Sequence, residues 1–242
     1  MDKLSSAFLA GIGLTRLRVY EQRPAPDGEH CGCAHVHAFT DEAYYVLSGR
    51  GAIELHDVEQ GFRRVELAPG DLVQFPPGTL HRSVSTAQLD VLALMSNAGL
   101  AERGDARIYF GAAVDDSPDE YARLRALPQS AGLEGALQRR DASVLAYAHL
   151  MELWRSDREA YWAELSRFVA LHRRLASLRA TEFEGIVAAG PADCLRLTQE
   201  RLRSPELAGH LTPPAAAVRH ADAQPTLGMC GVLRQLEHAT AV

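Results

Sequence analysis

The sequence predicts a β-barrel or β-sandwich in its first half and an α-helical region in its second half. The first half contains runs rich in valine and aromatic residues, which are interrupted by four turn signals: PAPDG at 24–28, SGRG at 48–51, APGD at 68–71 and PPG at 76–78. Short strands separated by turns at such spacing are typical of sandwiches and barrels. We therefore expect a β-barrel domain over residues 1–112 and a mainly helical region over residues 113–242.

The helical half has its own start and stop signals. Ser117 can cap a helix, and Pro118 suits the first helical position. Residues 157–178 carry apolar side chains at helical spacing. The segment TPPAAAVRHADAQPT, residues 212–226, has the composition of a loop. We expect the helical half to serve as a lid over the barrel or as a dimerisation element.

Composition narrows the classes of function. The chain has 242 residues and a formal net charge of −6, so the basic face that nucleic-acid binding needs is not expected. Because no apolar run approaches the roughly 20 residues that span a bilayer, no membrane association is expected. Four cysteines make no disulfide framework in a chain this long, which favours a cytoplasmic protein with reduced thiols. Because GxGxxG, P-loop, GxSxG and paired CxxC motifs are missing from the sequence, we expect no nucleotide cofactor.

The stretch CGCAHVH at residues 31–37 is the most informative part of the sequence. In a β-strand its two cysteines and two histidines share one face. His35 and His37 are then about 7 Å apart at Cα and can share one metal ion. Cys33 lies about 13 Å from His37 at Cα, so a straight strand cannot bring all four side chains to one ion. The other ligands must come from neighbouring strands.

Glu42 and His81 are the candidates for those ligands. Glu42 opens the strand that follows the short turn AFTD, and it returns beside the two histidines if that strand pairs with residues 33–37. His81 begins the strand that follows a Pro-Pro-Gly turn. Three imidazoles and one carboxylate suit a divalent first-row ion such as Fe, Mn, Ni, Cu, Co or Zn. An octahedral ion held by four protein ligands keeps two open positions.

At these residues the sequence resembles the cupin superfamily, whose two motifs have ten anchor positions. Eight of the ten match, namely His35, His37, Glu42, Gly49, Gly70, Pro76, Gly78 and His81. The departures are Glu29 in place of a glycine and Ser85 in place of an asparagine, and both lie outside the ligand set. The resemblance covers roughly residues 14–97. It implies a jelly-roll barrel of about six to eight strands, with a metal near its middle held by His35, His37, Glu42 and His81.

Other side chains are candidates for a substrate pocket. Tyr44 shares parity with Glu42, so it is expected to point into the barrel, where its phenol needs a hydrogen-bond partner. Arg18 lies either on a solvated outer face or, if that face points inward, where it can hold a substrate carboxylate. Cys33 is either a small buried residue or a thiol at the pocket rim. The pocket candidates are Arg18, Tyr20, Cys33, Gln74 and Ser83. His56, near a hairpin turn, is expected at the surface.

The predicted function is that of a metal-dependent enzyme acting on a small molecule. Similar cupins bind Fe(II) or another ion and bring O₂ and substrate together at its open positions. The resemblance therefore favours a dioxygenase-type oxidoreductase with Fe(II). A non-redox isomerase or lyase, in which Tyr44 or Glu42 moves protons, stays open. So do a natural-product tailoring enzyme and a small-ligand sensor. Similar barrels often dimerise, so a homodimer is one expected arrangement.

Overall fold

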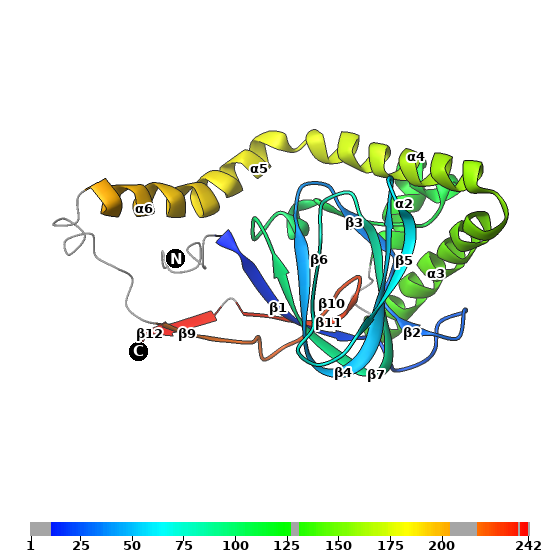
Figure 1. The fold of residues 1–242 in the computed structure, drawn as a ribbon, viewed down its shortest axis with the longest axis horizontal. Helices are drawn as coiled ribbons and strands as arrows, with labels where there is room; N and C mark the ends of the chain where they lie inside the picture. Colours follow the sequence, from blue (N-terminus) through cyan, green and yellow to red (C-terminus); the bar gives the residue numbers. More distant parts are fainter. Residues whose placement is uncertain (1–10, 127–130, 204–216, 237, 242) are drawn as a thin grey trace.

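The chain forms a β-barrel with helices packed on one side and a helical arm that extends away from it (Figure 1). The computed structural model describes residues 11–126, 131–203, 217–236 and 238–241. The predicted order of a barrel followed by a helical region is confirmed. The strands of the first half are β1 (Gly13–Val19), β2 (His30–Cys31), β3 (His35–His37), β4 (Glu42–Asp57), β5 (Gly61–Leu67), β6 (Leu72–Phe75), β7 (Leu80–Met95) and β8 (Ala106–Ile108), with the 3₁₀ turn η2 (Ala101–Arg103) before β8.

The strands β4 and β7 build the barrel because they pair along most of their length and bend together. Each has 16 residues, and the register between them shifts between Val46 and Gly51. At this bend Gly49 has a φ of 80°, and a Cβ there would lie 2.2 Å from the Gln88 carbonyl oxygen. The bend therefore requires a glycine. Before it β4 pairs with β6, and after it β4 pairs with β5, so one strand serves both faces of the barrel.

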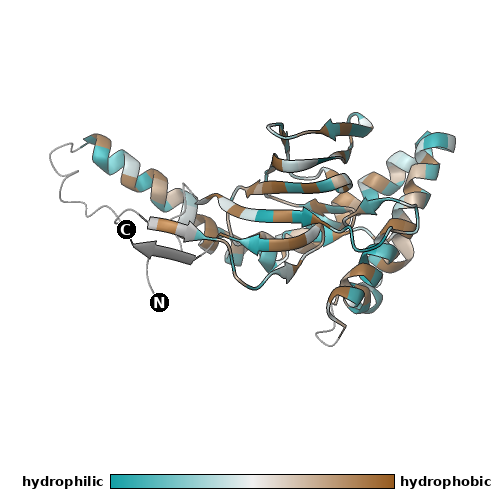
Figure 2. Ribbon diagram, turned by 90° about the horizontal axis from the view of Figure 1, so that it is seen from below, coloured by the Kyte–Doolittle hydropathy of each residue, from teal (hydrophilic) through white to brown (hydrophobic). Residues whose placement is uncertain are grey.

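The hydrophobic core lies between these two faces. Leu17 of β1 and Val46 of β4 meet Ile53 and Leu55 from the part of β4 beyond the bend. Hydrophobic and hydrophilic residues alternate along the strands, as Figure 2 shows, because successive side chains point to opposite faces. Burying each such aliphatic side chain contributes roughly 1.5–3 kcal/mol to folding. The core fixes which face of each strand points toward His35, His37, Glu42 and His81, which are called the metal cluster from here on.

Two long helices cover the outer face of β3 and the start of β7. Tyr147 of α3 and Phe168 of α4 pack against Val36 and Leu80 of the barrel. Helix α2 begins at Pro118 as predicted, but Ser117 makes no side-chain capping bond. The helices are α1 (Ala112–Asp115), α2 (Pro118–Arg125), α3 (Gly132–Ser156), α4 (Arg158–Ser177), α5 (Ala180–Val187), the π-helix η3 (Ala188–Ala192) and α6 (Asp193–Arg203).

The helices α5, η3 and α6 continue from α4 as an arm (Figure 1). Phe183 of α5 still packs against Ala38 and Leu100, and α6 extends beyond the barrel. No helix in the described part of the chain is long and apolar enough to cross a bilayer. The expectation that the helical half acts as a lid or a dimerisation element stays a prediction.

The end of the chain returns to the barrel, which the sequence did not predict. Four further strands are present: β9 (Ala217–His220), β10 (Thr226–Leu227), β11 (Gly231–Gln235) and β12 (His238–Ala241). β11 pairs antiparallel with β1 and so extends the barrel sheet. The loop expected over residues 212–226 is therefore wrong for residues 217–220, which form β9 and pair with β12, and for Thr226, which begins β10. Residues 212–216 lie outside the described residues. Local composition cannot reveal the distant partner of β11, which is β1.

The hairpin of β10 and β11 is fastened to the barrel through its loop. The Cys33 amide donates to the Met229 carbonyl at 2.8 Å, and the Tyr20 hydroxyl donates to the Gly228 carbonyl at 2.9 Å. The backbone of Cys230 lies directly over Gly32, where an added Cβ would approach the Cys230 Cα to 2.6 Å. The hairpin is therefore packed too closely for any larger residue at position 32.

His56 lies in a buried polar network between the barrel and the helices, so the expectation that it is solvated is wrong. Its Nδ1 is 2.9 Å from the Tyr161 hydroxyl, and its Nε2 is 2.8 Å from the Tyr147 hydroxyl. Tyr147 in turn donates to Glu54, which also accepts from Arg82. Burial, together with the Arg82 cation, lowers the pKa of His56 to about 3. His56 therefore stays neutral and joins α3 and α4 to β4.

We predict that Gly32→Ala lowers the free energy of unfolding by about 1–3 kcal/mol, because the new methyl group overlaps the Cys230 backbone. Urea unfolding monitored by circular dichroism measures the change. Gly185→Ala in α5 is the control, because no atom lies within 4 Å of the position that a Cβ would take there. That variant is expected to match the parent or gain up to about 1 kcal/mol. Equal stability of Gly32→Ala and parent would contradict the docking of the hairpin.

We predict that His56 makes stability depend on pH. Its folded pKa of about 3 lies below the ordinary value, so the unfolded chain takes up the proton first. The stabilisation is complete above about pH 6.5 and is lost as the pH falls toward 3. Between pH 7 and pH 5 the parent should lose about 2 kcal/mol more than His56→Gln. Urea unfolding of both proteins at the two pH values measures this, and equal losses would contradict it.

Candidate metal centre

Four side chains from three strands converge inside the barrel. His35 and His37 come from β3, Glu42 from the start of β4 and His81 from the start of β7. One ligand atom from each lies within 4.8 Å of every other, and all four residues are at most 4% exposed. The structure therefore brings together the four residues that the sequence marks as metal ligands.

Each imidazole presents its Nε2 to the centre of this cluster. The Nε2 atoms of His35 and His81 are 3.0 Å apart. Glu42 Oε2 lies 3.1 Å from His81 Nε2 and 3.3 Å from His37 Nε2. Glu42 Oε2 is buried and makes no hydrogen bond within the described residues. A carboxylate oxygen and three ring nitrogens are thus packed around one point.

The opposite ring nitrogens are held by acceptors. His35 Nδ1 lies 3.1 Å from the Cys33 carbonyl oxygen, and His81 Nδ1 lies 3.1 Å from the Thr79 carbonyl oxygen. His37 Nδ1 lies 3.0 Å from Asp105 Oδ2. Because carbonyl and carboxylate oxygens only accept, each Nδ1 carries a proton and each ring turns its Nε2 inward. Three Nε2 atoms that have lost their protons and an anionic oxygen in a buried space fit a divalent cation.

The charges in the cluster are arranged for positive charge at its centre. Burial alone raises the pKa of Glu42, but the imidazoles of His81 and His37 outweigh it and hold this pKa well below its usual range. Burial lowers the pKa of His37, yet Glu42 and Asp105 outweigh it and raise that pKa to about 9. Burial, with His81 and His37, keeps the pKa of His35 far below its usual range. A cation bound at the centre takes the place of these protons.

Asp105 is a site residue that the sequence reasoning missed. It is fully buried just before β8, and it accepts from the Phe39 amide at 2.7 Å while its other oxygen holds His37. Its backbone carbonyl lies 2.5 Å from His172 Nε2 of α4. Only a single acidic residue ahead of the apolar run ARIYF marks it in the sequence. A carboxylate that orients a ligating histidine typically strengthens metal binding.

Two hydroxyl groups lie beside the cluster on the inner face of the barrel. Tyr44 and Ser83 are buried, and neither hydroxyl makes a hydrogen bond of acceptable geometry within the described chain. They lie close enough to interact, and burial together with Glu42 raises the pKa of Tyr44 well above its ordinary value. Tyr44 therefore remains protonated and can donate its proton. The Phe75 ring, 4.5 Å from the His81 ring, forms an apolar wall of the same space.

Three of the predicted pocket residues do not face this interior. Arg18 lies on the outer face of β1, because Leu17 and Val19 face the core, and it pairs with Asp90 at 2.9 Å. Tyr20 packs against Ala136 and Leu137 of α3. Gln74 is exposed, because its neighbour Phe75 takes the inward position on β6. The expectation that these three residues line the pocket is wrong.

Of the two interpretations of Cys33, the structure supports a small buried residue over a thiol at the pocket rim. Its side chain packs with Ile108, Phe110 and Tyr121, and burial raises the pKa of its thiol to about 11. The thiol is therefore a buried apolar group. Its carbonyl, not its sulfur, serves the metal cluster by holding His35.

The fold and the cluster define the class: an antiparallel β-barrel protein with a buried three-histidine, one-glutamate cluster that fits a divalent metal ion. Residues 21–96 match the family model described as "Cupin domain". These residues hold both motifs and all four cluster residues. A match to this family is therefore found for residues 21–96, the part of the chain that contains the cluster.

Similar proteins cover only part of the chain. A curated relative, the acireductone dioxygenase of Exiguobacterium sibiricum, is 40% identical over 45 residues, which are 19% of this chain and 25% of the relative. A cupin protein from Bacteroides fragilis is 21% identical, with a TM-score of 0.28, over 37% of this chain and 68% of its own. A predicted oxalate decarboxylase from Thermotoga maritima is 24% identical, with a TM-score of 0.27, over 34% and 64%. The chain thus spans about a quarter of the curated relative's length.

We predict that His37→Ala and His81→Ala each abolish stoichiometric metal, because each removes one of four ligand atoms from a closed cluster. Inductively coupled plasma mass spectrometry on protein purified without chelator measures the metal content. His149→Ala is the matched control, since His149 is exposed on α3 and should leave the metal content unchanged.

The same experiment extends to the residue that orients His37. Asp105→Asn should keep the metal but lower its affinity by about 10- to 100-fold, because the amide holds His37 less firmly. Competition with a chelating dye measures the affinity. Full metal retention in both His37→Ala and His81→Ala would contradict the assignment of the cluster.

Proposed function

We propose that the protein is a metal-dependent oxygenase that uses O₂ on a small molecule and takes Fe(II) in the cluster. The observation that carries the proposal is the convergence of three imidazole lone pairs and one carboxylate oxygen in a buried space, with every Nδ1 already held by an acceptor. Four protein ligands leave two positions of an octahedral ion for substrate and oxygen. Zn, Mn, Ni, Co or Cu also suits this donor set.

Each side chain around the cluster has a separate role in such an enzyme. The three histidines and Glu42 would hold the ion, while Asp105 fixes the orientation of His37. A bound Fe(II) supplies the redox chemistry that activates O₂ next to the substrate. Tyr44 donates a hydrogen bond or a proton to a substrate oxygen, since its hydroxyl makes no hydrogen bond of acceptable geometry in the described chain. The apolar wall of Phe75 and the core around it exclude bulk water.

The likeness to an acireductone dioxygenase supports the assignment as an oxygenase, although it concerns 45 residues only. The donor set of three histidines and one glutamate differs from the triad of two histidines and one carboxylate that non-haem Fe(II) oxygenases commonly use. We therefore propose that the enzyme needs no 2-oxoglutarate. The four free cysteines favour a reducing, cytoplasmic setting.

A non-redox isomerase or lyase is the second candidate. The observation that favours it is the position of the Tyr44 hydroxyl within reach of Glu42 and Ser83, which is suited to proton transfer. In that case a redox-inactive ion such as Zn(II) would serve as a Lewis acid. The two candidates differ in a simple way, because only the oxygenase consumes O₂.

We predict that Fe(II)-loaded protein consumes O₂ when it is supplied with the small-molecule fraction of a cell extract, and that Zn(II)-loaded protein does not. An oxygen electrode under single-metal loading measures the uptake. Tyr44→Phe should keep its iron but slow the uptake by about 100-fold, because it loses the proton donor. Arg18→Gln is the control, since Arg18 lies on the outer face of the barrel.

Each other outcome points to a different function. Conversion of a small molecule by the Zn(II) form without O₂ uptake would contradict the oxygenase function and support an isomerase or lyase. Tight binding of a small molecule with no conversion by any metal form would replace both with the small-ligand sensor. Uptake that survives His81→Ala would show that the cluster is not the reactive site.

A further inference from the structure

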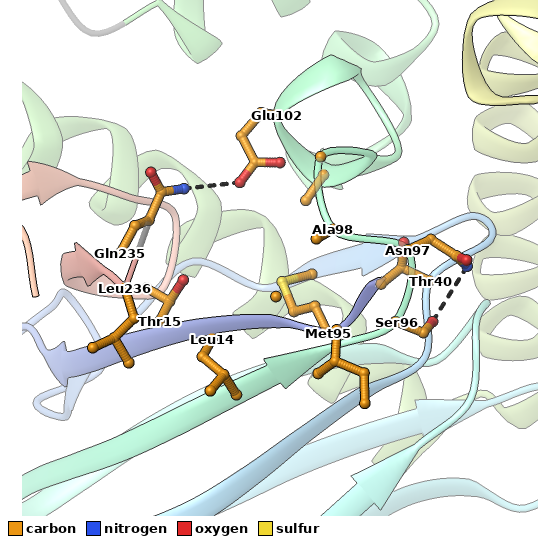
Figure 3. Close-up of a pocket in the computed structure, with 14 residues that line it drawn as sticks. Leu14, Thr15, Thr40, Met95, Ser96, Asn97, Ala98, Glu102, Gln235 and Leu236 are labelled. Carbon is orange, nitrogen blue, oxygen red and sulfur yellow. Dashed lines mark hydrogen bonds between the residues drawn. The ribbon is translucent and has the colours of Figure 1, made fainter. Parts of the chain in front are cut away.

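A pocket of about 250 Å³ lies at the end of the barrel where β4 begins and where β7 ends. It is lined by residues 12–15 and by the segment that follows β7, and Gln235 of β11 closes one side (Figure 3). Met95, which lines it, is the direct pairing partner of Glu42. The pocket is therefore next to a ligand of the metal cluster.

The pairing register shows that the pocket continues the barrel interior. Residues that pair directly in antiparallel strands share one face. Thr15 pairs with both Ala93 and Gln235, and Ala93 is part of the hydrophobic core. Thr15 and Gln235 therefore belong to the inner face, as Met95 and Glu42 do. A molecule in the pocket approaches the metal cluster from inside the barrel.

Thr40 lies at the end of the pocket that is nearest to the cluster. It lines the pocket, is only 2% exposed and lies two residues before Glu42. Its hydroxyl lies beside the carboxylate of Asp105, the residue that orients His37. Thr40 therefore connects the pocket wall with the group that orients a cluster histidine.

The charge at the outer end is negative and is not balanced within the pocket. Glu102 is the one charged residue among the described residues that line it, and its carboxylate is exposed. Glu102 accepts a hydrogen bond from Gln235 at 2.9 Å, as Figure 3 shows, and this bond holds the carboxylate beside the wall that Gln235 forms. A carboxylate in this position attracts cations and repels anions.

We propose that this pocket binds the substrate and that it selects a small molecule with an ammonium group over one with a carboxylate. Glu102 pairs with the ammonium group, and the side chains of Thr15 and Met95 contact the apolar body. The assignment rests on the proposed function, because it takes the metal cluster as the place of reaction. Glu102 and Gln235 are then specificity residues.

The test uses three probes with the same apolar body: 2-phenylethylamine, 2-phenylethanol and phenylacetate. Their dissociation constants are measured by protein-observed NMR at pH 7 on the full chain, once free of metal and once loaded with Zn(II). The amine should bind about three- to fivefold more tightly than the alcohol, the gain that one exposed ion pair provides. Phenylacetate should bind more weakly than the alcohol.

Two variants separate the pocket from a general charge effect. Glu102→Gln should reduce the affinity for the amine to that for the alcohol, and it should leave the affinity for the alcohol unchanged. Glu59→Gln removes an exposed carboxylate outside the pocket and should bind all three probes like the parent. Thr15→Leu, which fills the inner face, should weaken all three probes.

Three results would overturn the proposal. Phenylacetate could bind as tightly as the amine, or the preference for the amine could persist in Glu102→Gln. The third result is no binding of any probe at about 10 mM, a concentration at which even a weak site fills. The binding readout needs no turnover, so the two proposals can fail separately. The expected order of probe affinities without any O₂ uptake would support the proposed pocket and contradict the oxygenase function. O₂ uptake without that order would support the oxygenase function and contradict the proposed pocket.

Discussion

The structure depends on placing three imidazole lone pairs and one carboxylate oxygen within 4.8 Å of one another in a space that excludes water. When all four groups have lost their inward protons, lone pairs at such distances repel, and burial removes the solvent that would screen them. A cation at the centre reverses the sign of every one of these contacts. The rest of the barrel supplies the rigidity that keeps the four atoms in place: the bend at Gly49 folds β4 and β7 over the core and brings Glu42 opposite His81.

Orientation of the rings is as important as their position. Each Nδ1 meets an oxygen that can only accept, so each ring has one stable tautomer and one stable direction. Two of these oxygens are backbone carbonyls two residues before the histidine, so the local chain path provides them. The third belongs to Asp105, which must be brought from a distant strand. The cluster is thus partly encoded by local sequence and partly by tertiary structure.

This division explains how much could be predicted from the sequence. The four cluster residues follow from motif spacing and strand parity, which are local properties, and so does the order of a barrel before helices. Strand parity places Arg18 and Leu17 on opposite faces of β1, but only the packed core shows that Leu17 points inward. Asp105, Met95 and Gln235 join the site through pairing across 50 residues or more of chain, as with Gln235 opposite Thr15. His56 belongs to an ordinary hairpin in the sequence, and only the fold encloses it between two tyrosines from the helices.

The helical half is tied to the metal cluster through one short chain of contacts. His172 of α4 meets the backbone carbonyl of Asp105, and the Asp105 carboxylate holds His37. The end of the chain is tied to the same interior from the other side, since β11 pairs with β1 and carries Gln235 to the pocket. The packing of α4 therefore helps to hold Asp105 in place and, through Asp105, the ring of His37. The barrel alone therefore does not define the site, because the segments that follow it fix one ligand and one wall of the pocket.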